Sequence, residues 1–124
     1  MTTPPPVIVY IDDEPLLCSV FQRILEGSGA SVVTFTDPEH ALAYVGSHPI
    51  AVVVCDYRMP MISGLDVLAR VEASVPFILI SGDIAIASLV ARNPRVTHFL
   101  YKPFQPETLL ALLGPYLPPS TAGG

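Results

Sequence analysis

The sequence predicts an α/β domain built on a five-stranded parallel sheet with helices on both faces. Short apolar runs alternate five times with amphipathic stretches along the chain, which is the pattern of successive βαβ units. Runs such as "AVVVC" do not alternate polar with apolar residues, as expected of strands buried on both faces. Five such repeats in 124 residues fit one flavodoxin-like, doubly wound domain of strand order 2-1-3-4-5.

The five expected strands are apolar runs of four or five residues. The first is β-branched and bounded by prolines and acids, whereas the second is weaker. They cover residues 7–11, 32–35, 51–55, 77–80 and 97–101.

Capping residues and apolar stripes predict the first two helices. After Pro15, apolar residues recur at i, i+3, i+4 and i+7, and Gly27 and Gly29 are expected to end this helix. Asp37 is expected to N-cap the second helix, with Pro38 at its first position. The predicted buried stripes are Leu17, Val20, Phe21 and Ile24 in the first helix and Ala41, Leu42 and Val45 in the second.

The last three helices have less uniform signals. A third helix is expected before Pro76, and a fourth of poor periodicity over residues 84–92. Pro106 opens a fifth, which Gly114 and Pro115 terminate. The predicted inward residues are Leu65, Leu68 and Val71 in the third helix and Leu109, Leu110 and Leu113 in the fifth.

The composition indicates a globular, cytoplasmic domain. Hydrophobic residues make up 51% and charged residues 14%, and no apolar run reaches the ~20 residues of a membrane span. The N-terminus lacks a signal-peptide pattern, and the net charge of −5 argues against direct nucleic-acid binding. Cys18 and Cys55 are expected to be reduced core residues. The domain is expected to span residues 7–117, with flexible tails at 1–6 and 118–124.

Polar residues follow four of the expected strands. Asp12 and Asp13 come after the first strand, Asp56 after the third, Ser81 after the fourth, and Lys102, the sole lysine, after the fifth. Ligands of doubly wound sheets bind beyond the carboxyl ends of the strands, so these side chains are expected to meet in one crevice. Each residue taken alone also fits an ordinary role as a helix cap, a turn residue or a solvated lysine.

This set of side chains has a definite chemistry. Neighbouring carboxylates repel one another unless a cation lies between them. Oxygen ligands without His or Cys suit Mg²⁺, with Mn²⁺ as an alternative. A carboxylate beside such a metal can attack a phosphoryl group and form an aspartyl phosphate, which an ammonium group and a hydroxyl stabilise. Gly82, which has no side chain, leaves room for a phosphoryl donor.

Four segments together resemble the receiver domain of two-component response regulators. They are "VYIDDEP" (9–15), "VVVCDYRMPMISG" (52–64), "ILISGD" (78–83) and "FLYKPF" (99–104), in the order of that family. The resemblance implies a signalling domain and not an enzyme in the usual sense. Such a domain assists its own phosphorylation and dephosphorylation, and it takes its phosphoryl group from a histidine kinase or a histidine phosphotransfer protein.

The resemblance implies roles for the acidic residues. Asp56 would be the phosphoacceptor and a ligand of Mg²⁺. Asp13 would bind the metal directly and Asp12 through water, and the backbone carbonyl of Arg58 would complete the protein ligands. Arg58 and Asp83 stand at variable positions that in the family influence the lifetime of the phosphoryl group.

The remaining roles concern the response to phosphorylation. Lys102 would pair with the phosphoryl oxygens, and its bond to Pro103 is usually cis in the family. Ser81 would be the switch hydroxyl and Phe99 the switch aromatic, with Tyr101 as a second candidate ring of less suitable spacing. The face formed by the fourth helix, fifth strand and fifth helix would then change its affinity for partners, a second copy of the chain among them.

Two segments depart from the family pattern: the third helix and its loop at residues 64–76 are shorter than usual, and a second departure keeps alternatives open. Residues 84–96 lack the usual alanine-rich fourth helix and contain "RNPRV", in which Pro94 breaks a helix. The first alternative is therefore a pseudo-receiver, an interaction module with an altered fourth-helix face. A metal-dependent phosphatase is disfavoured because Arg58 stands where its second aspartate belongs, and a flavodoxin-like electron carrier because "DDEPLL" replaces a phosphate loop. Met1 favours a natural start, but a stand-alone regulator, a relay shuttle and a piece of a longer regulator all remain open.

Overall fold

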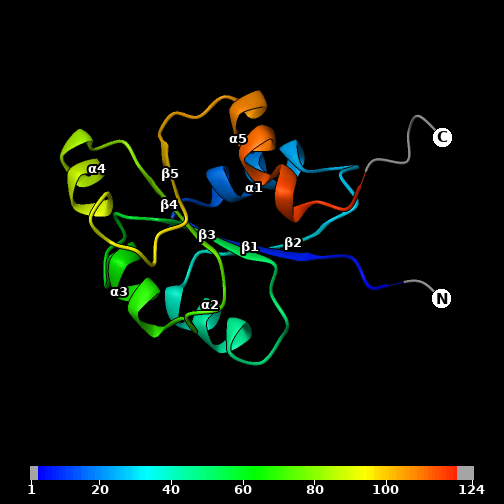
Figure 1. Cartoon of the computed structure of the whole chain (residues 1–124), viewed down its shortest axis with the longest axis horizontal. Helices are drawn as coiled ribbons and strands as arrows, with labels where there is room; N and C mark the ends of the chain where they lie inside the picture. Colours follow the sequence, from blue (N-terminus) through cyan, green and yellow to red (C-terminus); the bar gives the residue numbers. More distant parts are fainter. Residues whose placement is uncertain (1–2, 120–124) are drawn as a thin grey trace.

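A computed structural model describes residues 3–119 and arranges five parallel strands in the order β2-β1-β3-β4-β5 (Figure 1). This order confirms the predicted doubly wound sheet. Of the predicted tails at 1–6 and 118–124, residues 1–2 and 120–124 lie outside the described residues, and the domain boundaries at 7 and 117 stay predictions. The strands are Val7–Ile11 (β1), Ser31–Phe35 (β2), Val52–Asp56 (β3), Phe77–Ser81 (β4) and His98–Tyr101 (β5).

Helices cover both faces of the sheet. Helices α1 and α5 pack on one face, and α2, α3 and α4 pack on the other (Figure 1). Within residues 3–119, no helix has the length and apolarity needed to cross a membrane. The helices are Pro15–Ile24 (α1), Pro38–Val45 (α2), Gly64–Arg70 (α3), Ile84–Val90 (α4) and Pro106–Leu113 (α5), and α5 continues into the short 3₁₀ helix Gly114–Tyr116 (η1).

The central strands β1, β3 and β4 form the core. Apart from Val7, which is half-buried, every residue of these three strands is buried, because successive side chains point to opposite faces and both faces are covered. Cys18 and Cys55 are free and buried, as predicted. One buried cluster faces α1 and α5, and the other faces α2, α3 and α4.

Two predicted helix stripes are partly wrong. Val20 of α1 is 39% exposed and Leu110 of α5 is 37% exposed. The face of α1 that contacts the sheet is instead centred on Phe21, with Cys18 and Leu25 at three and four residues to either side. An apolar stripe wider than the contact with the sheet leaves its outer edge in solvent, so the sequence overstates how much of each helix is buried.

The ends of α3 and α4 also differ from the sequence prediction. Helix α3 ends at Arg70, well before Pro76, because Val71 has extended backbone angles (φ −94°, ψ 140°). Its start is fixed by a capping box in which Ser63 and Asp66 bond each other's backbone N–H groups. Helix α4 is regular but ends at Val90, two residues before the predicted end at 92. The Asp83 side chain caps its start by accepting from the N–H of Ala85 at 2.9 Å.

Candidate functional site

The carboxyl ends of four strands bring the expected site residues to one edge of the sheet. Asp56 and Ser81 are the last residues of β3 and β4, one residue further into the strands than the sequence indicates. Asp12 directly follows β1 and Lys102 directly follows β5. Asp12, Asp56 and Ser81 are the buried polar residues of the described chain, at 0%, 5% and 3% exposure. The sheet therefore holds these groups in positions that solvent scarcely reaches.

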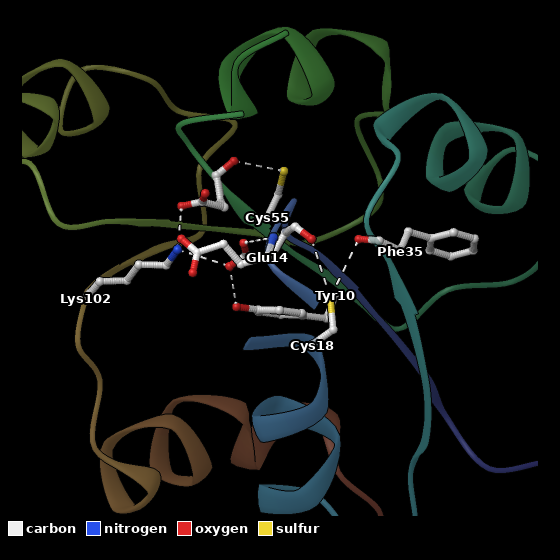
Figure 2. A network of polar contacts seen from close by, with 8 residues as sticks. Tyr10, Glu14, Cys18, Phe35, Cys55 and Lys102 are labelled. Carbon is white, nitrogen blue, oxygen red and sulfur yellow. Dashed lines mark hydrogen bonds and ion pairs between the residues drawn. The ribbon is translucent and has the colours of Figure 1, made fainter. Parts of the chain in front are cut away.

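Lys102 bridges two of the aspartates. Its Nζ lies 3.0 Å from Asp12 Oδ2 and 3.1 Å from Asp56 Oδ1, and Figure 2 shows its side chain extending from the chain after β5 into the polar network. The peptide bond from Lys102 to Pro103 is cis. One ammonium thus partly neutralises two buried carboxylates at the ends of different strands.

Asp13 completes an acidic cluster with Asp12 and Asp56. One carboxylate oxygen of each lies within 4.8 Å of the others. The donor set is all oxygen, with three negative charges against the single ammonium of Lys102. These residues fit a small hard divalent cation such as Mg²⁺, which prefers carboxylate oxygens and would relieve their repulsion.

Asp12 has both carboxylate oxygens engaged by protein donors. The backbone N–H of Glu14 donates to Oδ1 at 3.0 Å, and the Tyr10 hydroxyl donates to Oδ2 at 2.8 Å (Figure 2). Lys102 contacts the same Oδ2 atom. Because Asp13 is only half-buried, it is the better placed of the two neighbouring acids to bind a cation directly.

The surroundings alter the proton affinities of the central pair. Burial raises the pKa of Asp56 to about 6; the charge of Lys102 lowers it and that of Asp12 raises it. Burial lowers the pKa of Lys102, but its hydrogen bonds and charge interactions with the two aspartates outweigh burial, and the net pKa is raised. Lys102 is therefore a cation at neutral pH, and Asp56 is ionised but close to its titration range.

A cleft of about 600 Å³ opens next to this cluster. The guanidinium of Arg58 crosses its rim to Asp83, with Nη2 to Oδ2 at 2.7 Å, and this bond lowers the pKa of Asp83. Asp56 is therefore reached through a polar cleft with an ion pair at its edge. The lining residues are Glu14, Asp56, Arg58, Ser81, Gly82, Asp83, Ile84 and Lys102.

Gly64 lets the loop after β3 close against the strand. A Cβ at this position would lie 2.6 Å from Leu79 Cδ1 and 2.7 Å from the backbone oxygen of Asp56, closer than side chains pack. The Gly64 N–H also donates to the Tyr57 carbonyl at 2.8 Å. The loop that carries Arg58 is therefore held beside the cleft, while a metal contact from the Arg58 carbonyl stays a prediction.

The two expected switch residues lie on adjacent strands but apart from each other. The Ser81 Oγ accepts from the Asp83 N–H at 3.0 Å. Phe99 is half-buried and packs edge-on against Tyr101, with ring centroids 4.9 Å apart. Ser81 pairs in register with Tyr101, and Phe99 pairs with Leu79. Strand β5 thus links the hydroxyl end of β4 to the candidate ring.

Tyr10 is the site residue that the sequence reasoning missed. It lies inside β1 among aliphatic residues and would be assigned to the core by its position alone. The available signal was a hydroxyl in a strand otherwise made of Val and Ile, two residues before an acidic pair.

The fold and this acidic, lysine-bridged cleft define a doubly wound α/β domain with a centre suited to phosphoryl chemistry. A family model described as the response regulator receiver domain matches residues 8–114. The chain therefore belongs to the response regulator receiver family.

Individual relatives agree with this assignment. The chain is 30% identical over 128 residues to the peroxide stress-activated histidine kinase mak3 of Schizosaccharomyces pombe, covering 94% of this chain and 6% of that protein. It is 33% identical over 112 residues to the response regulator protein TmoT of Ectopseudomonas mendocina, covering 86% of this chain and 50% of that protein. This chain thus spans half or less of the length of these two curated relatives.

A solved structure shows the same fold. The signal receiver domain of an HD domain-containing protein from Pseudomonas fluorescens Pf-5 superposes with a TM-score of 0.82 at 21% identity, covering 94% of this chain and 89% of that chain. At this identity the likeness concerns the fold alone.

Proposed function

We propose that this receiver domain accepts a phosphoryl group on Asp56, with Mg²⁺, from a histidine kinase or a histidine phosphotransfer protein. The observation that carries the proposal is the position of Asp56, which lies 3.1 Å from Lys102 Nζ beside two further aspartates and an open cleft. The domain acts as a signalling module that assists its own phosphorylation and dephosphorylation, and not as a metabolic enzyme.

Each site residue has a task in this transfer. An oxygen of Asp56 attacks phosphorus, the new O–P bond forms as the P–N bond of a phosphohistidine breaks, and the electron pair stays on the donor imidazole. Lys102 then pairs with a phosphoryl oxygen. When bound, Mg²⁺ would neutralise charge on the phosphoryl oxygens. Asp13 and Asp56 would hold it directly, Asp12 through water, and the Arg58 carbonyl would complete the protein's share.

Exposed apolar side chains in the segments after the strand ends support a protein as donor. Leu16, Met61 and Ile84 are 73%, 88% and 77% exposed, and they lie in the segments that follow β1, β3 and β4. Exposed apolar groups around a polar centre are typical of surfaces that contact another protein. The net charge of −5 supports a domain that does not bind nucleic acid directly, and we propose a cytoplasmic location for it.

We further propose that Ser81 and Phe99 couple phosphorylation to the surface of α4, β5 and α5. A hollow of about 540 Å³ lies beside Phe99 and Tyr101 and is walled by residues of α4 such as Val90. This space allows the half-buried ring to change position when Ser81 turns from Asp83 to a phosphoryl oxygen. The same surface is the one through which we propose that two copies of the chain pair.

The alternative, a pseudo-receiver that binds partners without phosphorylation, rests on the unusual segment 84–96. The regular, capped α4 removes part of that argument, and the juxtaposition of the acidic cluster with Lys102 supports the phosphorylated function.

Intact-mass measurement tests the proposal directly. Incubation with Mg²⁺ and acetyl phosphate is expected to add about 80 Da, the mass of one phosphoryl group, and EDTA is expected to prevent it. The Asp56→Asn variant should show no gain, whereas Asp66→Asn, at the exposed cap of α3, should behave as the wild type. A gain that persists in Asp56→Asn, or none in the wild type, would contradict the proposal.

A further inference from the structure

Tyr10 connects the hydrophobic core to the acidic site. It is fully buried in β1, and its ring stacks on Phe21 of α1 with centroids 4.2 Å apart and an interplanar angle of 17°. Its hydroxyl donates to Asp12 Oδ2 at 2.8 Å. Figure 2 shows the Tyr10 ring at the edge of the polar network with its hydroxyl directed into the network. The packing against Phe21 fixes the direction of this hydrogen bond.

Tyr10 and Lys102, which both donate to Asp12 Oδ2, differ in how easily each side chain can move to another partner. Lys102 has a flexible stem and also contacts Asp56 Oδ1 at 3.1 Å. Tyr10 is confined by close packing on all sides and has no second acceptor among the hydrogen bonds of the described residues. If Lys102 moved to a phosphoryl oxygen, Tyr10 would remain as the donor to that oxygen of Asp12.

We propose that Tyr10 is a positioning residue of the phosphorylation site: its hydroxyl holds Asp12 from inside the core, so that Lys102 is free to exchange Asp12 for the phosphoryl group. The inference rests on the proposed function and assigns a task to a residue outside the cleft.

Removal of this hydroxyl has a defined consequence. In Tyr10→Phe the ring still packs on Phe21, but a buried carboxylate oxygen loses its fixed donor. Asp12 then depends on Lys102, which competes with a cation for the acidic cluster. Outer-shell partners of metal ligands typically contribute ten- to a hundredfold to metal affinity, and we expect a loss of about tenfold here.

Electron paramagnetic resonance of free Mn²⁺ measures this affinity without relying on phosphorylation. Tyr10→Phe is expected to bind Mn²⁺ about tenfold more weakly than the wild type. The matched control is Tyr116→Phe, which removes a hydroxyl from a ring packed against the same core cluster and should leave Mn²⁺ affinity unchanged. In an Asp12→Ala background, Tyr10→Phe should have no further effect, because it acts through Asp12.

Two results would overturn the inference. One is Mn²⁺ affinity in Tyr10→Phe within twofold of the wild type, and the other is an equal loss with and without Asp12. The acetyl phosphate mass assay distinguishes failure of the inference on Tyr10 from failure of the proposed function. If the wild type gains a phosphoryl group and binds Mn²⁺ while Tyr10→Phe matches it, only the role of Tyr10 is wrong. If the wild type neither gains a phosphoryl group nor binds Mn²⁺, both proposals are wrong.

Discussion

The ammonium of Lys102 lies 3.1 Å from the carboxylate of Asp56 although strand β4 separates the two strands that carry them. The intervening strand ends on Ser81, which has no large side chain to block the contact. Because the same ammonium lies 3.0 Å from Asp12, a change of charge at any one of these groups acts on the other two.

Replacing Lys102 with Met is expected to lower the free energy of unfolding by about 3 kcal/mol at neutral pH in EDTA, since two buried carboxylates lose their shared cation. Saturating Mg²⁺ should restore part of the loss by taking the place of the ammonium. Urea denaturation with and without Mg²⁺ measures both effects. Arg92→Met, which removes an exposed positive charge, is the control. Equal stability of Lys102→Met and the wild type in EDTA would show that the bridge does not stabilise the fold.

Replacing Asp56 with Asn is expected to stabilise the metal-free domain at neutral pH. The pKa of Asp56 is raised from 3.8 to about 6 in the folded chain, so the folded state binds the proton more tightly than the unfolded state. The stability associated with Asp56 is thus fully present below about pH 4 and is lost as the pH rises through about 6. A two-unit shift corresponds to about 3 kcal/mol.

Thermal unfolding across this pH range in EDTA provides the measurement. The advantage of Asp56→Asn should vanish near pH 4 and reach its full size above about pH 7. Glu26→Gln, at an exposed position, should show no such pH-dependent gain in stability. An advantage that is constant with pH would mean that burial of the Asp56 charge is not its cause.

Mg²⁺ is expected to stabilise the wild type and to do so more strongly at neutral than at acidic pH, because protons and the cation compete for the same carboxylates. A concentration tenfold above the dissociation constant should add about 1.4 kcal/mol. Asp13→Asn should abolish most of this gain. Thermal unfolding over a series of Mg²⁺ concentrations measures this gain in stability. An undiminished gain in Asp13→Asn would exclude Asp13 as a ligand.

Replacing Arg58 with Ala is expected to shorten the lifetime of the phosphoryl group a few-fold, because the bond to Asp83 crosses the rim of the cleft and restricts water. Stability should hardly change, since this ion pair is largely exposed. Decay of the phosphorylated mass after removal of the donor measures the lifetime. Arg70→Ala breaks a similar surface pair with Glu39, away from the cleft residues, and should leave the decay unchanged. A lifetime in Arg58→Ala equal to that of the wild type would assign the pair no part in protecting the phosphoryl group.

Replacing Phe99 with Trp gives a specific reporter, since the chain contains no tryptophan. Its fluorescence is expected to change on phosphorylation with acetyl phosphate and Mg²⁺ as the ring changes its exposure. Adding Ser81→Ala should leave the mass gain detectable but remove most of the fluorescence change. A full fluorescence change without the Ser81 hydroxyl would separate the ring from the proposed switch.

Much of the candidate site follows from the order of residues along the chain. Alternating strands and helices require parallel strands, and the polar residues at their carboxyl ends must then share one edge. Asp12, Asp56, Ser81 and Lys102 were therefore predictable as neighbours, and the structure brings them together. The exposure of Val20 and the early end of α3 could not be predicted in this way. Apolar patterning shows neither how far a sheet covers a helix nor where the backbone leaves the helical conformation.

The fold class and the edge of the sheet at which the chemistry lies can be predicted from the sequence, because both depend on the period and the order of its residues alone. Which atoms meet is seen only in three dimensions: Tyr10 contacts Asp12, Lys102 contacts two acids, and Arg58 contacts Asp83, 25 residues away. The reason is geometric. A hydrogen bond needs its heavy atoms within about 3 Å, and that depends on strand register, helix packing and side-chain reach, none of which a periodic pattern specifies.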